Sequence, residues 1–277
     1  MTVVGTSRVD VSCATARFCG AVGAGGQASV WNGSTWARPV SLGPAVAPGS
    51  PAPAIACAGP AFCLAAMGNS VMAWNGVSWA PSASVPEAQA LACASPRFCT
   101  VVSGIGNAYV FDGATWSGAF NAWGGPSSIS CTTPSFCMAA IGGASEWDGS
   151  AWSRPVDVDP VGVIDAVSCS GTALCLAVDS VGNVLVWRGA SWSAPVPLHP
   201  GSGSASSAAL TALSCTSTTV CVVGSADGAV SSWNGTAWSA FDVVTGDHAL
   251  VSLSCVASGF CMAADSAGGV VWSSGVT

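Results

Sequence analysis

The sequence predicts an all-β fold, a seven-bladed β-propeller with four antiparallel strands per blade, because two short motifs recur about every 40 residues along its 277 residues. The first motif is a cysteine pair, C-x5-C, and the second is W-[N/D/R]-G-x-x-W. Between the motifs, runs rich in Val, Leu, Ile and Trp are bounded by Gly, Asn, Asp, Ser and Pro, as in short strands. No segment has the apolar periodicity of a long helix. Repeats of this length built from short strands are typical of propeller blades.

The fifth repeat shows the four strands that we expect in each blade. They cover residues 165–169, 175–179, 184–187 and 192–198. Asn-Gly and Asp-Gly dipeptides between strands accept the positive φ angles that tight hairpin turns need. Pro39, Pro155 and Pro195 each follow the second motif tryptophan by three residues and fall in the fourth strand. Because proline lacks the amide of a central ladder, the fourth strand is predicted to be the outer edge of the blade.

A single domain over residues 1–277 is predicted, with blades that begin near residues 9, 53, 89, 127, 165, 211 and 251. The seventh repeat reaches Trp272 and Gly275 without a fourth strand. We therefore expect residues Met1–Val4 to supply that strand, complete blade 7 and close the ring, which removes an open sheet edge.

Each cysteine pair is predicted to be a disulfide within one blade. The spacing places the two cysteines across the hairpin between the first and second strands, within bridging distance. Zinc sites normally combine two closer-spaced pairs, and C-x5-C is not the C-x-x-C redox motif. Only His199 and His248 are available to complete any metal site, so we expect no metal and no cofactor. The predicted pairs are Cys13–Cys19, Cys57–Cys63, Cys93–Cys99, Cys131–Cys137, Cys169–Cys175, Cys215–Cys221 and Cys255–Cys261.

The tryptophan motif is predicted to straddle the turn between the third and fourth strands. It runs from Trp31 to Trp36, Trp74 to Trp79, Phe111 to Trp116, Trp147 to Trp152, Trp187 to Trp192 and Trp233 to Trp238. With Trp272 counted as the lone indole of the seventh repeat, only Trp123 of the 13 tryptophans stands outside the pattern. We expect the motif tryptophans to pack between adjacent blades. The alternative is a ring of stacking platforms for sugars.

Composition excludes some classes of function. Six Lys and Arg against 13 Asp and Glu, a net charge of −7, argue against nucleic-acid binding. The mean hydropathy is +0.57, but no apolar run approaches the ~20 residues of a membrane-spanning helix. We therefore expect no nucleic-acid partner and no membrane span. Seven disulfides imply a secreted protein or one on the extracellular surface. No signal peptide is recognisable at Met1, and we expect it to have been removed or to lie upstream.

Two repeats carry a resemblance to known proteins. Residues 130–140 read SCTTPSFCMAA and residues 92–102 read ACASPRFCTVV, each followed by W/F-D-G-x-x-W. They resemble the repeats of secreted or surface-exposed actinobacterial β-propellers, over essentially the whole chain. The tryptophan-bearing blades are also similar, more loosely, to tectonin- and tachylectin-type lectin propellers, which implies carbohydrate binding. Residues 112–116 resemble the sialidase Asp-box, except that Asp112 and Gly113 are adjacent here instead of separated by one residue.

Candidate contact residues are expected where the repeats differ, in the connections between blades, since variable loops on a rigid scaffold are where recognition concentrates. These connections cover residues 40–54, 121–126, 157–164, 199–209 and 242–249, and share one face with the turns between second and third strands. Trp123 is the first candidate because it is off-pattern in a Gly- and Pro-bounded loop. The further candidates are His199, Asp247 and His248 in the connections, and Asp179 and Asp265, with Asp227, in the turns.

The inventory of catalytic groups is thin. There is no lysine, one tyrosine, two glutamates, and neither a G-x-S-x-G elbow nor a phosphate loop. We predict a non-catalytic recognition domain that binds a glycan or another cell-surface ligand through the inter-blade loops. The alternative is a structural or protein-docking module that contacts another chain or domain of a secreted assembly. A two-carboxylate glycoside-acting enzyme is the third, less favoured reading.

Overall fold

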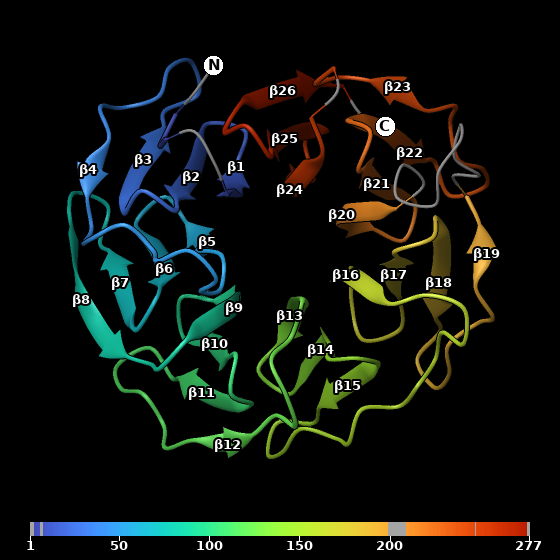
Figure 1. Ribbon diagram of the computed structural model, residues 1–277, viewed down its shortest axis with the longest axis horizontal. Helices are drawn as coiled ribbons and strands as arrows, with labels where there is room; N and C mark the ends of the chain where they lie inside the picture. The colour runs from blue at the N-terminus through green and yellow to red at the C-terminus, as the bar shows by residue number, and fades with distance from the viewer. Residues whose placement is uncertain (1–2, 6–7, 199–208, 247, 276–277) are drawn as a thin grey trace.

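Seven small antiparallel sheets surround a central channel in the computed structural model (Figure 1). The structure describes residues 3–5, 8–198, 209–246 and 248–275, and these contain strands and no helix. Blades 1, 2 and 3 are β1–β4, β5–β8 and β9–β12, and blade 4 is β13–β15. Blades 5, 6 and 7 are β16–β19, β20–β23 and β24–β26. The fold is therefore the predicted seven-bladed β-propeller.

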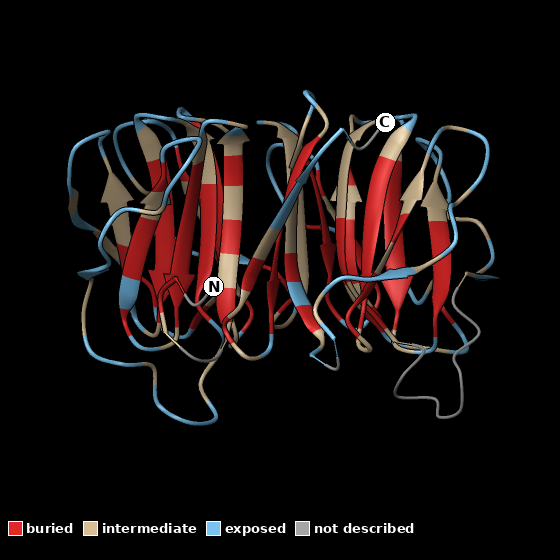
Figure 2. Cartoon of the chain, turned by 90° about the horizontal axis from the view of Figure 1, so that it is seen from above, coloured by how far each residue is buried: buried red, intermediate tan, exposed pale blue. Residues whose placement is uncertain are grey.

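The first strand of each blade lines the channel, and later strands lie progressively farther out. The first strands are β1 (Val9–Thr15), β5 (Ala54–Gly59), β9 (Ala88–Ser95), β13 (Ser128–Thr133), β16 (Ile164–Cys169), β20 (Leu210–Ser217) and β24 (Leu250–Val256). The second strands are β2 (Phe18–Gly23), β6 (Phe62–Met67), β10 (Phe98–Ser103), β14 (Phe136–Ala140), β17 (Cys175–Asp179), β21 (Val220–Ser225) and β25 (Phe260–Asp265). Most second-strand residues are buried, whereas the loops at both ends of the ring are exposed (Figure 2).

The third strands are regular, and the outer strands have only two residues each except β8, which has six. The third strands are β3 (Gln27–Trp31), β7 (Ser70–Trp74), β11 (Asn107–Phe111), β15 (Ala144–Trp147), β18 (Asn183–Trp187), β22 (Ala229–Trp233) and β26 (Val270–Ser274). The outer strands are β4 (Val40–Ser41), β8 (Trp79–Ser84), β12 (Phe120–Asn121), β19 (Val196–Pro197) and β23 (Asp242–Val243). In blade 4 the outer segment is reduced to two bridges, Ala144 to Val156 and Trp147 to Trp152.

A side-chain bond explains why the predicted fourth strand of blade 5, residues 192–198, is only partly a strand. The Ser193 amide donates to the Val186 carbonyl at 2.8 Å, but the Val186 amide donates to Ser193 Oγ at 3.0 Å. A hydroxyl thus replaces a backbone acceptor and interrupts the ladder. Ladder pairing resumes only at β19, directly after Pro195.

The predicted closing strand at residues 1–4 is absent from the described part of blade 7, whose sheet has three strands. Val3 and Val4 are buried in a cluster with Val9 of β1 and Met262 of β25, between the last and first blades, but they form no ladder with β26. This short segment contacts blade 1 tightly, because a Cβ on Gly23 would lie 2.2 Å from the Val4 carbonyl oxygen. Met1 and Thr2 lie outside the described residues.

All seven predicted disulfides are present, one in each blade. Each joins two cysteines that face one another in the ladder between first and second strands, as Cys13 faces Cys19. Their Cα atoms are 3.9–4.0 Å apart. The end of the ring that carries these hairpins and the W-x-G-x-x-W turns is called the cysteine face below. The opposite end, with the connections between blades, is called the inter-blade face.

The two tryptophans of each motif copy form a tilted pair. Their ring centroids are 5.6–5.9 Å apart in the five complete copies, and Phe111 and Trp116 are 5.3 Å apart. In blade 4, Trp147 donates its indole N–H to the Pro134 carbonyl at 3.0 Å and packs edge-on against Phe120 of blade 3. The motif tryptophans therefore belong to the interfaces between adjacent blades.

Trp272 is not the equivalent of these residues, which corrects the count made from sequence. The first motif tryptophans face the second cysteine of their blade, as Trp187 faces Cys175. In blade 7 that position holds Ser273, and Trp272 faces Met262. The one-residue offset turns Trp272 to the opposite side of its strand, where it packs 5.1 Å from the Trp31 ring of blade 1.

Candidate functional site

The central channel is a cavity of about 610 Å³ lined by the first strands of all seven blades. A partial ring of serines surrounds it near the cysteine face. The serine that precedes the first cysteine of one blade accepts a hydrogen bond from the backbone N–H of the first cysteine in the next blade, as Ser12 does from Cys57 at 2.9 Å. The same bond links blades 4 to 5, 5 to 6, 6 to 7 and 7 to 1, through Ser130, Ser168, Ser214 and Ser254.

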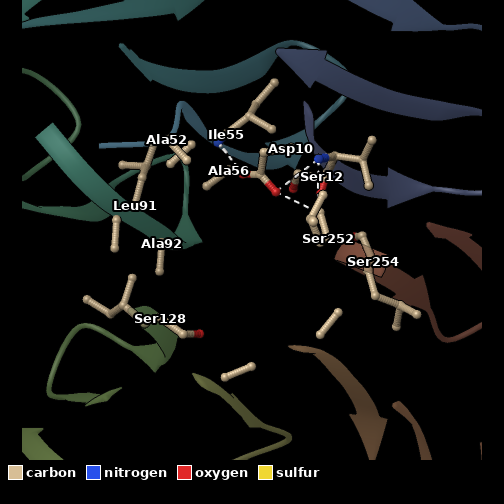
Figure 3. A pocket seen from close by; sticks show the side chains of 18 of the residues that line it. Asp10, Ser12, Ala52, Ile55, Ala56, Leu91, Ala92, Ser128, Ser252 and Ser254 are labelled. Carbon is tan, nitrogen blue, oxygen red and sulfur yellow. Dashed lines mark hydrogen bonds between the residues drawn. The ribbon is translucent and has the colours of Figure 1, made fainter. Parts of the chain in front are cut away.

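Alanine interrupts this ring at two positions. Ala56 and Ala92 occupy the serine position in blades 2 and 3 and form an apolar part of the channel wall (Figure 3). Sequence reasoning missed the ring, although its signal is visible: Ser or Ala stands directly before the first cysteine in every repeat. Because each serine oxygen satisfies a backbone amide of the neighbouring blade, the ring holds the blades in register.

Asp10 joins three blades on the channel wall. Its carboxylate accepts the Ile55 amide at 2.7 Å, the Val11 amide at 3.0 Å and the Ser252 hydroxyl at 2.5 Å (Figure 3). Burial raises the pKa of Asp10 to about 6, even though all three hydrogen bonds favour its charged form. Asp10 is therefore a structural link between blades 7, 1 and 2.

A second acidic group lies on the blade 5 side of the ring. Asp165, on the channel wall, has its pKa raised to about 6 by burial and then by the charge of Asp179. Asp159 is 6% exposed, and its Oδ2 atom has no hydrogen-bond donor among the described residues. Burial, followed by the neighbouring Asp179 carboxyl, raises the pKa of Asp159. A Cβ on Gly162 would lie 2.6 Å from Asp179 Oδ2 and 3.0 Å from Asp159 Oδ2, so both carboxyls converge there.

The buried aspartates proposed from sequence close turns. Asp179 accepts the Val181 amide at 3.0 Å and the Asn183 amide at 2.7 Å, and its other oxygen accepts the Asn183 side-chain amide. Asp265 likewise accepts the amides of Ala267 and Gly269. These carboxylates hold the turns between second and third strands. Asp227 accepts the Ser225 hydroxyl in the corresponding turn of blade 6.

Trp123 lies against the outer segment of blade 4. It is 44% exposed with a φ angle of 68°, and its indole N–H donates to the Trp152 carbonyl at 3.2 Å. The Arg154 guanidinium lies 4.7 Å from the ring centroid, within the range of a cation–π contact. One indole face is thus already covered by a cation. Ligand binding by Trp123 stays a prediction.

The histidine candidates are not brought together by the described structure. His199 and Asp247 lie outside the described residues. His248 is exposed, and its carbonyl accepts the Thr245 hydroxyl at 2.7 Å. Within the described ranges no group of three or more His, Cys, Asp or Glu side chains is arranged to hold a metal ion. The described residues also contain no helix suited in length and hydropathy to crossing a membrane.

A groove of about 650 Å³ lies between the outer parts of blades 4 and 5, and is called the 4/5 groove below. From blade 4 it is lined by Met138 of β14, Glu146 of β15 and Val156, and from blade 5 by Trp187 and Trp192. The connection from blade 4 to blade 5, within the predicted loop 157–164, adds Asp157, Val158 and Pro160. Sequence reasoning placed this loop on the recognition face but did not find the groove.

Four exposed valines belong to segments that contribute residues to the 4/5 groove. They are Val156, Val161, Val163 and Val196, with exposed fractions of 59–62%. Val156 lines the groove, Val161 follows the lining residue Pro160, and Val196 follows the lining residue Pro195. All four belong to blades 4 and 5 or to the connection between these blades.

Comparison with known proteins supports the architecture. No protein-family model matches the chain, and no curated protein matches it. The solved structure described as YCF48 bound to D1 peptide has a TM-score of 0.74 and 14% identity, over 100% of this chain and 96% of that one. The WD40 β-propeller domain of Doa1 has a TM-score of 0.74 and 11% identity, over 99% of this chain and 95% of that one. The chain has a propeller fold. At these identities the likeness shows the fold alone.

Proposed function

We propose that this propeller is a non-catalytic recognition domain of a secreted protein, and that it binds a segment of a partner polypeptide in the 4/5 groove. The observation that carries the proposal is the combination of a groove of about 650 Å³ with exposed valines in the segments that line it. Covering each valine removes apolar surface from water, which contributes roughly 1.5–3 kcal/mol for a fully buried side chain. Successive side chains of an extended segment point to opposite sides, so alternate side chains of a bound segment can enter the groove.

A solved propeller supports this choice of ligand class. The YCF48 structure, similar over the whole of this chain, is described as bound to a peptide. The seven disulfides of this chain indicate an oxidising environment, and we place the domain outside the cytoplasm on that ground. We propose no reaction, because Asp10 and Asp179 are engaged with backbone amides and act as structural groups.

A glycan is the second candidate ligand, favoured by one feature of the same groove. Trp187 and Trp192 line it together with the hydroxyl-bearing Ser191 and Ser193. An indole face beside hydroxyl and carboxylate groups is the usual chemistry of sugar recognition. The looser resemblance to tectonin- and tachylectin-type lectin propellers predicts the same class.

The test is a peptide-display selection on the intact propeller, followed by affinity measurements on variants. The V156S/V161S double variant replaces the exposed valine of the groove wall and the exposed valine that follows the lining residue Pro160, without adding charge. The V77S/V243S double variant is the matched control, because these valines are 84% and 67% exposed on blades 2 and 6. Selected peptides should lose about tenfold or more in affinity with V156S/V161S, roughly 1.4 kcal/mol, and remain unaffected by the control.

Two outcomes contradict polypeptide docking at this site. One is a selection that yields no peptide whose affinity depends on Val156 and Val161. The other is binding of soluble glycans on an array, lost in V156S/V161S or in a Trp192→Ala variant that keeps its melting temperature. The second outcome assigns the groove to a sugar.

A further inference from the structure

The charges that line the 4/5 groove are all of one sign. Glu146 and Asp157 belong to its wall, and no arginine does, while the sequence contains no lysine. Neither carboxylate forms an ion pair within the described parts of the chain. Burial, and secondarily the charge of Asp148, raises the pKa of Glu146, so its charged form is poorly compensated in the unbound protein.

The two faces of the ring carry different charges. Arg8 is the only arginine of the described residues at the inter-blade end of the ring. The acidic residues at that end are Asp10, Glu87, Asp157, Asp159, Asp165, Asp179, Asp227, Asp242 and Asp265. At the cysteine face, by contrast, Arg17, Arg97 and Arg188 outnumber Asp112 and Asp148. The inter-blade connection that borders the 4/5 groove thus lies in a field that attracts cations, whereas the Trp187–Trp192 turn at its other end belongs to the cysteine face.

We infer that the 4/5 groove binds a basic polypeptide segment, whose apolar side chains contact the valines while an arginine or lysine pairs with Glu146 and Asp157. This inference rests on the proposed polypeptide-docking function and specifies the partner. The negative charge of the groove favours a positively charged partner. The apolar part of its wall adds contact area and favours neither sign of charge. A guanidinium on a flexible stem suits the site well, because its aliphatic part packs on Trp192 or Val156 while its head reaches a carboxylate.

Charge also argues against the other occupants of such a groove. A second copy of this chain carries a net charge of −7 and no lysine, so its surface would repel this one. Nucleic acid is excluded for the same reason. A basic partner is the occupant whose charge agrees with the two carboxylates of the groove and with the acidic inter-blade face at one end of it.

The experiment compares three versions of one groove-binding peptide that differ at a single position, carrying arginine, glutamine or glutamate. Isothermal titration at 20 mM and 500 mM salt gives each affinity. At low salt we expect the arginine peptide to bind at least about tenfold more tightly than the glutamine peptide, and the glutamate peptide to bind most weakly. The advantage of arginine should shrink at high salt, because exposed charges are screened.

Protein variants locate the effect. The E146Q/D157N variant should abolish the preference for arginine while the glutamine peptide binds as before. The control, E87Q/D242N, removes two exposed charges from the same face on blades 2 and 6 and leaves groove contacts intact. The control should change the arginine preference by less than about threefold, since screened, distant charges contribute weakly.

The failures of the two proposals are distinguishable. If peptides bind through Val156 and Val161 but with equal affinity for arginine, glutamine and glutamate, polypeptide docking stands and the basic partner is wrong. The same conclusion follows if E87Q/D242N reduces the preference as strongly as E146Q/D157N. If no peptide binding depends on the valines, the proposed function itself is wrong. Melting temperatures of all variants exclude unfolding as the cause.

Discussion

The two faces of this ring differ in how far they repeat. On the cysteine face the same bonds occur in blade after blade, as when Asn32 and Asp148 each accept two amides of the turn that follows. On the inter-blade face, the connections differ in length and chemistry, and among the described residues only the connection between blades 4 and 5 contributes to the 4/5 groove. A contact that recurs from blade to blade is explained by the blade fold itself, whereas a surface that occurs only once can be specific for one ligand. The comparison therefore assigns stability to the repeated bonds and recognition to the unrepeated 4/5 groove, which extends from the inter-blade connection to the Trp187–Trp192 turn of the cysteine face.

The most damaging change predicted by this comparison is Trp147→Ala. Trp147 is 3% exposed, packs on Trp152 and Phe120, and satisfies the Pro134 carbonyl. Its loss leaves a cavity between blades 3 and 4 and should lower the free energy of unfolding by about 3–5 kcal/mol. Guanidinium unfolding followed by circular dichroism measures the change. A loss below about 1 kcal/mol would contradict a structural role for the motif indoles.

Removal of one disulfide from the cysteine face should have the next largest effect on stability. The C131A/C137A variant opens the blade 4 disulfide, whose cysteines are separated by six positions. The chain-entropy model gives about 2.4 kcal/mol for a loop of this size. The same unfolding measurement should show this loss, while affinity for groove-binding peptides stays unchanged. Loss of affinity in the folded variant would mean that the two faces are coupled.

Neutralising an acidic residue of the channel wall should raise the stability of the protein instead of lowering it. Burial raises the pKa of Asp165 from 3.8 to about 6, so the folded protein favours the neutral carboxyl. Its stabilising contribution is complete below about pH 4 and is lost as the pH rises through about 6. Asp165→Asn, which keeps a neutral side chain, should raise the unfolding free energy by about 1–2 kcal/mol at pH 7.

Thermal melts of wild type and D165N across pH 4–7 test this prediction. The difference between the two proteins should vanish near pH 4. Asp10, with a pKa also raised to about 6, should make wild type and variant alike less stable as the pH rises over the same interval. A D165N protein that is equally or less stable than wild type at pH 7 would show that the charged carboxylate has a partner in solution.

Trp123→Ala should have the smallest effect on stability. The residue is 44% exposed, and its main contacts are one hydrogen bond and the Arg154 cation–π pair. Such exposed contacts contribute about 0.5–1 kcal/mol each, so the loss should not exceed roughly 1–2 kcal/mol. A loss as large as that of Trp147→Ala would place Trp123 in the scaffold despite its off-pattern position.

Repetition explains how much of the fold could be predicted from sequence. C-x5-C predicts a hairpin with facing cysteines because a strand pair of that length brings the two Sγ atoms together, and the structure confirms all seven pairs. The register of Trp272 could not be predicted, because one inserted or deleted residue turns a side chain to the other face of its strand. Neither could the loss of ladder pairing at Ser193, where a hydroxyl substitutes for a backbone group.

The candidate site was predictable only as a region. Loop 157–164 was selected because the repeats differ there, and Asp157 and Pro160 line the 4/5 groove. Nothing in the sequence indicated Glu146 as a site residue, because the position before a motif tryptophan is an ordinary strand position. Glu146 lines the 4/5 groove because it lies on the side of β15 that faces blade 5, and this depends on how the two blades pack together.

By itself, the sequence determined the number of blades, the disulfide pairs and the location of the variable face, because these follow from local spacing repeated seven times. The tertiary structure alone decided which side chains meet: the serine ring across blade boundaries, the convergence of Asp159 with Asp179, and the 4/5 groove with its two carboxylates. These depend on how one blade is placed against the next. That placement arises from contacts between residues about 40 positions apart, which the local pattern within a single repeat does not encode.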